Sequence, residues 1–286
     1  MRRAEPRRRP PSSATRPARA RHRAAVAAAT LGALAAAAAA AAPAPGGNAA
    51  GCARPVYLTF DTGHMGVAPL VAEVLRRQQV RATFFLADER TLEGGSSLDA
   101  HWAPWWRALA DDGHAFGSHT WEHDVWVADT ATGFVVRPTA GPHAGERRNL
   151  SAAEYCAELE RPAARWLAMT GRPMSAIFRA PAGRKSPALL AAARRCGWTE
   201  VGWSKAGFLG DELPSERYPN ADLLARALRD VRPGDILLAH LGIWSRREPW
   251  APTVLEPLIE GLKARGICFA TLREHPRYAA AAARTR

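Results

Sequence analysis

Residues 55–75, PVYLTFDTGHMGVAPLVAEVL, contain the pattern that decides the fold class of this chain. The first half is a short run of β-branched and aromatic residues that ends at Asp61 and is followed by a glycine-containing turn. In the second half, apolar residues recur every three or four positions, as they do on one face of an amphipathic helix. A strand, a turn and a helix in this order predict the first unit of an α/β domain.

The same alternation continues towards the C-terminus. Short strand-like runs are separated by segments with helical periodicity, which favours a parallel sheet covered by helices. We predict seven strands, at residues 56–60, 82–86, 114–118, 176–179, 200–203, 236–240 and 267–271. A single α/β barrel commonly takes about 200 to 250 residues, so residues 51–286 are predicted to form one domain.

Composition and charge exclude several classes of protein. The chain has 286 residues, of which 47% are hydrophobic and 23% charged, so a wholly disordered chain is excluded. Its net charge is +12, but nine arginines and one glutamate precede Gly51, which leaves only about +4 for the rest. We therefore expect no nucleic-acid partner.

Residues 1–50 read as a signal peptide and linker. An arginine-rich start precedes an alanine-rich stretch at 24–42 and a Pro-Gly segment at 43–47, the order found in secretory signals. The alternative is a disordered or helical tail. We expect export to the periplasm or the medium, with cleavage between Ala42 and Cys52 and, as a lesser alternative, a lipid anchor at Cys52. No other run is long enough to span a membrane, so the mature chain is expected to lack a span.

Four cysteines occur, and none lies in a CxxC pair, which excludes finger-type zinc clusters. In an exported protein, Cys52 and Cys268 are the pair to test for a disulfide. Cys156 and Cys196 fit equally well as small buried hydrophobic residues.

The connection at residues 124–150 is too long for a simple crossover and is rich in Gly and Pro. A capping box, Ser151 with Glu154, begins the next helix. The insertion is either a surface loop or hairpin, or a wall of the substrate cleft.

Polar residues capable of chemistry stand at the carboxyl ends of five predicted strands. In an α/β barrel the loops at that face meet at one site, so residues distant in sequence become neighbours. The residues are Asp61, His119, His123, Arg179, Asp211 and His240. We therefore predict a shared active site.

This set of residues fits metal-assisted hydrolysis of an amide or ester. His119 and His123 are four residues apart, which on a helical turn brings both imidazoles to one metal ion. Asp61 would take a proton from water, His240 would protonate the leaving nitrogen, and Arg179 would keep Asp61 ionised. The chain has no GxSxG elbow and no Walker loop, which argues against a serine hydrolase or P-loop enzyme.

Four ordered motifs resemble those of the polysaccharide deacetylases, carbohydrate esterase family four, over about residues 55–275. The family's TFDDG appears here as the variant TFDTG at 59–63, and its HTxxH as HTWEH at 119–123. Its RxPxG appears as RAPAG at 179–183 and its LxH as LAH at 238–240. The resemblance implies a distorted seven-stranded (β/α) barrel and removal of N-acetyl groups from amino sugars with a divalent metal, commonly zinc.

The resemblance also implies a role for each matched residue. Asp61 corresponds to the catalytic base, Arg179 to its partner, and His240 to the general acid. His119 and His123 correspond to metal ligands, and the backbone N–H of Ala182 falls where the family stabilises the oxyanion. The family's DxxDW motif is poorly preserved here, and Asp211 is the residue that would tune His240.

Thr62 is the main departure, because the family usually has a metal-ligating aspartate at this position. A neutral hydroxyl is a poorer ligand than a carboxylate. The third metal position would then be filled by Thr62 itself, by water, or by His64 or Asp124. Loss of one negative charge would leave the ion a stronger Lewis acid, so the substitution does not require inactivity.

Tryptophans near the predicted site offer flat faces for sugar rings, Trp244 above all, with Trp250, Trp121 and Trp126 as further candidates. Their alternative role is to anchor half-buried loops. The function predicted from these observations is an exported, metal-dependent N-deacetylase of an N-acetylated glycan, with peptidoglycan favoured. The alternative function is a catalytically silent glycan-binding protein that has lost its metal.

Overall fold

The computed structural model describes residues 52–286. The predicted signal peptide and linker at 1–50 lie outside the described residues, so that division of the chain stays a prediction. Within residues 52–286, no helix is both long enough and apolar enough to cross a membrane.

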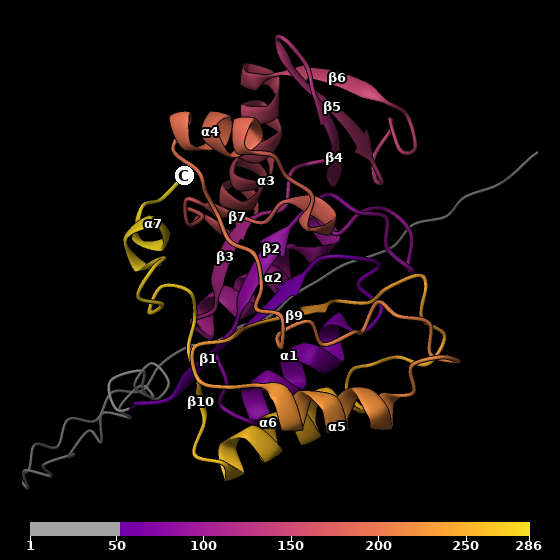
Figure 1. Ribbon diagram of the computed structural model, residues 1–286, viewed down its shortest axis with the longest axis vertical. Coiled ribbons are helices and arrows are strands. Elements are labelled where there is room, and N and C mark those ends of the chain that lie inside the picture. Colours follow the sequence, from indigo (N-terminus) through magenta and orange to yellow (C-terminus); the bar gives the residue numbers. More distant parts are fainter. Residues whose placement is uncertain (1–51) are drawn as a thin grey trace, which may run out of the picture. The chain divides into compact units, whose positions relative to one another are not determined.

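Helices and strands alternate along the domain, as the sequence pattern predicts (Figure 1). The strands are β1 (Pro55–Asp61), β2 (Thr83–Leu86), β3 (Ala115–Ser118), β4 (Asp124–Asp129), β5 (Gly133–Pro138), β6 (Arg148–Ser151), β7 (Ile177–Phe178), β8 (Thr199–Glu200), β9 (Ile236–His240) and β10 (Cys268–Phe269). The α-helices are α1 (Ala68–Arg77), α2 (Ala103–Asp111), α3 (Ala152–Thr170), α4 (Pro187–Arg195), α5 (Asn220–Asp230), α6 (Leu255–Ala264) and α7 (Ala279–Ala283). Two short 3₁₀ turns are η1 (Ala100–Trp102) and η2 (Pro181–Gly183).

The seven predicted strands form one parallel sheet, which confirms the predicted α/β class. The order is β10-β1-β2-β3-β7-β8, and β9 also pairs with β1. In the β1–β9 ladder, Asp61 is the register partner of His240. The first and sixth predicted strands therefore deliver an acid and a base side by side.

The predicted strand at 200–203 is wrong in extent, because β8 ends at Glu200. The carbonyl oxygens of Val201 and Gly202 accept hydrogen bonds from the Arg179 guanidinium, each at 3.2 Å. These carbonyl groups therefore hold a buried cation, and strand pairing stops before them.

β8 and β9 do not pair directly anywhere in the described chain. Residues 204–208 lie between them, where Ser204 N donates to Ile236 O at 3.0 Å and Leu238 N donates to Gly207 O at 2.8 Å. An irregular segment thus continues the sheet from β8 towards β9. This irregular connection is where the barrel is distorted.

The helices cover the sheet in two groups. α1, α5 and α6 lie together at one end of the view in Figure 1, α3 and α4 lie towards the other end, and α2 packs against α3 nearer the middle. Their apolar faces meet strand residues such as Phe60 and Phe84 in a core that is almost free of solvent. This packing fixes the carboxyl ends of the strands.

The insertion at 124–150 folds as an antiparallel sheet, in which β5 pairs with both β4 and β6. Phe134 and Val136 of β5 are buried in the main core, so the sheet is packed onto the domain. The predicted capping box is present, with Glu154 N donating to Ser151 Oγ at 3.2 Å at the start of α3. The insertion is therefore a three-stranded sheet, and because Thr139 and Ala140 line the pocket described below, it is also a wall of that pocket.

Both cysteine pairs form disulfides. Cys52 is bonded to Cys268, with the Cα atoms 6.0 Å apart, and joins the start of β1 to β10. Cys156 is bonded to Cys196, with the Cα atoms 6.3 Å apart, and joins α3 to the end of α4. The interpretation of Cys156 and Cys196 as free, buried side chains is thus wrong.

Candidate active site

A pocket of about 670 Å³ lies at the carboxyl ends of β1, β3 and β9. Side chains from segments far apart in the sequence line it together. Among them are six of the residues that the sequence singled out, namely Asp61, His119, His123, Ala182, Trp244 and His240.

Asp61 stands at the end of β1 and is almost fully buried. Its Oδ1 accepts a hydrogen bond from Arg179 Nη1 at 2.8 Å, and its Oδ2 lies 3.4 Å from His119 Nε2. Burial alone would raise the pKa of Asp61, but the Arg179 guanidinium and the neighbouring histidines hold the pKa below its usual range. Asp61 is therefore ionised at neutral pH and able to accept a proton.

Arg179 is completely buried, and four groups satisfy its guanidinium. Besides Asp61 and the two carbonyl groups after β8, the ring of Phe85 lies beneath it, with the guanidinium carbon 4.4 Å from the ring centroid. Such a cation is held in one orientation. The fixed guanidinium group in turn holds the Asp61 carboxylate at the pocket.

His119 and His123 lie side by side, with ring centroids 4.7 Å apart. The expectation that they share a helical turn is wrong, since residues 119–123 form a loop in which Thr120 and His123 have φ values of 58° and 53°. His119 Nδ1 is 2.8 Å from the carbonyl oxygen of Arg179, and His123 Nδ1 is 2.6 Å from Thr139 Oγ1. A carbonyl oxygen only accepts, so His119 must donate from Nδ1.

His240 is held by Asp211 in two ways. The backbone N–H of His240 donates to Asp211 Oδ2 at 2.6 Å, and Nδ1 lies 3.1 Å from both carboxylate oxygens. Burial would lower the pKa of His240, but the charge and hydrogen bonds of Asp211, helped by other carboxylates, raise it to about 9. The structure places Asp211 where a residue that tunes His240 has to lie.

Thr62 is buried behind the pocket, and its hydroxyl group already has two partners. Thr62 Oγ1 donates to Glu89 Oε2 at 2.5 Å and accepts from Ala87 N at 3.1 Å. Glu89 itself lines the pocket together with the two imidazoles. The Thr62 hydroxyl group therefore holds the Glu89 carboxylate at the edge of the pocket.

The other two candidates for the third metal position lie elsewhere. His64 lines a separate small cavity behind His240, where its ring meets the edge of Trp244. Asp124 is buried at the start of β4, and burial together with the carboxylate of Glu158 raises its pKa to about 7. Neither side chain lines the pocket that holds His119 and His123.

Of the four candidate tryptophans, only Trp244 has a largely exposed ring at the pocket, with 54% of its surface accessible. The Arg90 guanidinium covers one face of this ring at 4.7 Å. Trp250 is buried, and Trp121 is covered by Arg161. Ala182 is in a left-handed conformation (φ 53°), which turns the backbone of the RAPAG motif at the edge of the pocket.

Among the pocket residues that the sequence analysis did not name are Glu89, Trp203 and Glu212. Glu89 comes three residues after β2, so the strand-end rule applied to that strand would have found it. Glu212 Oε2 is 3.7 Å from His240 Nε2 and directly follows Asp211. Trp203 packs against Arg179 at 5.6 Å, a contact that no local pattern predicts.

The donor atoms suit a divalent ion in part. Within residues 52–286, no group of three His, Cys, Asp or Glu side chains is arranged as a ready metal site. However, both imidazoles have Nδ1 engaged by oxygen, which is how metal-ligating histidines are held in place, and Nε2 of His119 faces Asp61 Oδ2 at 3.4 Å. Burial also lowers the pKa of His123 to about 4, so this ring is neutral and has a lone pair to offer.

Comparison with known proteins places the chain among polysaccharide deacetylases. The family "Polysaccharide deacetylase" matches residues 48–201. A chitooligosaccharide deacetylase of Azorhizobium caulinodans is 30% identical over 76% of this chain and 92% of its own length, and a peptidoglycan-N-acetylmuramic acid deacetylase of Bacillus subtilis is 23% identical over 77% and 70%. A family 4 acetyl xylan esterase from Clostridium thermocellum, solved with a cobalt ion, shares the fold with a TM-score of 0.58 and 24% identity, over 79% of this chain and 91% of the esterase.

Proposed function

This chain belongs to the polysaccharide deacetylase family, and from that premise we propose that it is an exported, metal-dependent enzyme that removes N-acetyl groups from peptidoglycan. The observation that carries the proposal is the β1–β9 register, which sets Asp61 beside His240 at a pocket that also contains two imidazoles. An ionised carboxylate and a protonated imidazole are the base and the acid that amide hydrolysis needs.

His119 and His123 would hold the divalent ion through Nε2, with zinc the favoured metal. Glu89 would supply the third protein ligand in place of the family's aspartate, because its carboxylate lines the same pocket and Thr62 fixes one of its oxygens. A carboxylate is a better donor to zinc than a threonine hydroxyl group. When bound, the ion would polarise the acetyl carbonyl group and make water more acidic.

The residues of the chain then divide the proton transfers. Asp61 accepts the proton of the attacking water, and Arg179 keeps its carboxylate ionised and aimed at the pocket. His240 donates from Nε2 to the leaving nitrogen, because Asp211 occupies Nδ1 and keeps the ring protonated. The backbone N–H of Ala182 would stabilise the negative charge that develops on the carbonyl oxygen.

Two observations support export and a cell-wall substrate. The two disulfides favour an oxidising compartment, as the arginine- and alanine-rich start of the chain does. An exported deacetylase meets peptidoglycan first. The exposed ring of Trp244 would stack on a sugar beside the scissile acetamide.

Thr62 is also the observation that favours the alternative, a silent glycan-binding protein. Acetate release separates the two functions. Purified protein is incubated with zinc and N-acetylated glycan strands, and acetate is measured with and without a chelator. The proposal expects release that the chelator stops and that Asp61→Asn abolishes while the fold is kept. A protein that binds the strands, holds no zinc and releases no acetate would be the silent binder.

A further inference from the structure

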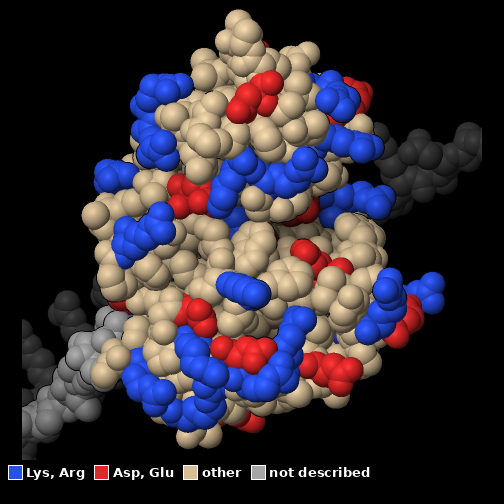
Figure 2. All heavy atoms as spheres, viewed as in Figure 1, with Lys and Arg blue, Asp and Glu red and all other residues tan. Residues whose placement is uncertain are grey.

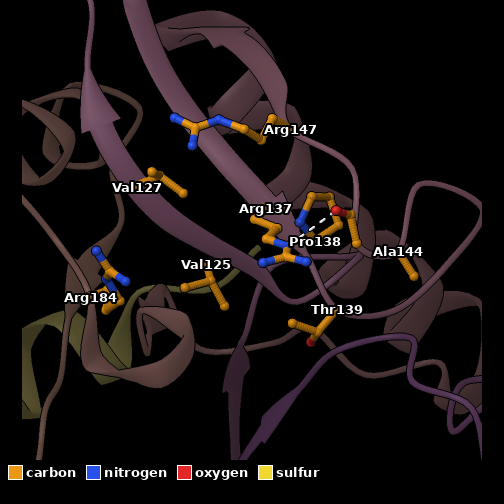
Figure 3. A pocket seen from close by; sticks show the side chains of 9 residues that line it. Val125, Val127, Arg137, Pro138, Thr139, Ala144, Arg147 and Arg184 are labelled. Carbon is orange, nitrogen blue, oxygen red and sulfur yellow. Dashed lines mark hydrogen bonds between the residues drawn. The ribbon is translucent and has the colours of Figure 1, made fainter.

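A second cavity, of about 920 Å³, lies beside the catalytic pocket, against the β4–β5–β6 sheet (Figure 3). Val125 and Val127 of β4 form its apolar floor. Arg137 of β5, Arg147 of the following loop and Arg184 after η2 stand around that floor. We call these three residues the arginine groove.

The positive charge of the arginine groove is unpaired within the described part of the chain. No carboxylate lies within 4.0 Å of the guanidinium groups of Arg137, Arg147 or Arg184. Arg137 Nε donates only to the carbonyl oxygen of Gly145, at 3.1 Å. By contrast, the neighbouring Arg148 bonds to Glu122 and lies 3.9 Å from Glu158. Three guanidinium groups around one hollow are therefore available to an external anion.

The groove continues into the catalytic pocket. Thr139 lines both, and its hydroxyl group is 2.6 Å from Nδ1 of the proposed metal ligand His123. Arg184 follows Ala182 by two residues, so the segment that borders the pocket also carries one of the arginines. In Figure 2, lysine and arginine side chains gather where the β4–β6 layer meets the rest of the domain. A chain held in the pocket would extend into the groove.

We propose that the arginine groove binds carboxylate groups carried by the same glycan strand whose acetamide lies in the catalytic pocket. The planar guanidinium groups match a carboxylate in geometry and charge, and the two valines suit an adjacent methyl group or sugar face. Peptidoglycan carries such groups on lactyl ethers and on peptides, whereas chitin strands are neutral. This inference rests on the proposed function. The three guanidinium groups would give the enzyme its preference for an anionic strand.

The test is binding, so that it does not depend on turnover. The dissociation constants of His240→Ala protein for peptide-bearing strands, peptide-stripped strands and neutral chitin oligomers of equal length are measured by calorimetry. The same background then receives Arg137→Gln, Arg147→Gln and Arg184→Gln together. We expect the triple change to weaken binding of anionic strands by about 10-fold or more and to leave chitin binding unchanged. Arg194→Gln, an exposed arginine of α4 away from the groove, is the matched control.

The two anionic strands identify the carboxylate. If peptide-stripped strands keep the effect, the lactyl group is the ligand, and if only peptide-bearing strands show it, the peptide is. Equal losses for anionic and neutral strands, or no loss for either, would overturn the inference. Added salt should weaken the binding of anionic strands more than that of chitin, because salt screens exposed ionic contacts. This difference should disappear in the triple variant. If the wild-type protein releases no acetate from any strand, the proposed function fails, while the binding comparison still decides the role of the groove.

Discussion

The contact between Asp211 and His240 sets the protonation state of the proposed general acid. The pKa of His240 is raised to about 9, so the imidazolium form persists through neutral pH and is lost only as the pH rises past that value. In Asp211→Asn the stabilising charge is absent, and the pKa should fall towards the ordinary histidine value of about 6.5. The basic limb of the kcat/KM profile should therefore move to lower pH.

A pH series of kcat/KM for both proteins tests this expectation. Glu212→Gln is the matched control, because Glu212 also lies near His240 but its Oε2 is 3.7 Å from Nε2 and makes no hydrogen bond with it. Its basic limb should move less. An unchanged limb in Asp211→Asn would mean that His240 does not act as the acid.

Thr62 and Glu89 form the hydrogen-bonded pair on which the proposed third metal ligand depends. If Glu89 supplies the anionic ligand, Glu89→Gln should weaken zinc binding by about 10-fold or more. Thr62→Asp in the same chain restores a carboxylate at the family position and should recover the affinity. Titration of zinc in a chelator-buffered series measures both without reference to turnover.

The single variant Thr62→Asp is the internal control for this pair. The new aspartate would lie next to Glu89, whose carboxylate now accepts a hydrogen bond of 2.5 Å from the threonine hydroxyl group. The two carboxylates should repel each other unless an ion lies between them. Equal zinc affinity of the wild type and Glu89→Gln would exclude Glu89 from the ligand set.

At the residue scale, the sequence predicted the positions that follow strands and two of their partners, Arg179 for Asp61 and Asp211 for His240, but not the contacts of Glu89 and Trp203. Asp61, Arg179 and His240 were identified because each ends a strand. The strand-end rule applied to β2 would have found Glu89, but not its contact with Thr62, which crosses from one strand to the next. Trp203 was missed because it touches Arg179 only after the chain has folded. Contacts of this kind are set by tertiary packing and leave no local pattern.

At the scale of elements, the tight turn after β1 depends on a glycine. Gly63 has a φ of +123°, and a Cβ atom there would lie 2.1 Å from the backbone oxygen of Gly242. Backbone cannot move aside as a side chain can, so Gly63→Ala should displace the segments that carry Asp61 and His240. We expect a large loss of acetate release together with a lower melting temperature.

Gly94 is the matched control for this substitution. Its φ of +90° makes alanine similarly unfavourable, but no atom lies within 4 Å of the Cβ position. Gly94→Ala should therefore destabilise the fold by about 1 kcal/mol or a little more and leave activity unchanged. Equal effects of the two changes would mean that backbone conformation alone, rather than the contact with Gly242, matters at Gly63.

The strands were predictable because alternating β and α periodicity is local, and all seven overlap the predicted runs. Their ends were not, since Arg179 takes the carbonyl groups that would have lengthened β8. The β4–β6 sheet was predictable only as an insertion. Its strands pair with one another across turns, and the sequence does not show that Phe134 and Val136 reach the main core.

At the scale of the whole molecule, the two disulfides close loops of very different length. Cys156 and Cys196 are 40 residues apart in the sequence, whereas Cys52 and Cys268 are 216 apart and join nearly the two ends of the described domain. Loss of a cross-link increases the entropy of the unfolded chain by an amount that grows with loop length. The chain-entropy relation gives about 4 kcal/mol for the shorter loop and about 5 kcal/mol for the longer one.

We therefore expect Cys52→Ser with Cys268→Ser to lower the free energy of unfolding more than Cys156→Ser with Cys196→Ser does. Urea unfolding of the two double variants and the wild type measures the order, with the wild type under reducing conditions as the common limit. Activity at low temperature should survive in both variants, because neither disulfide contacts the pocket. A larger loss from the Cys156–Cys196 pair would show that packing between α3 and α4, which contact β3 and β8, outweighs the entropy of the longer loop.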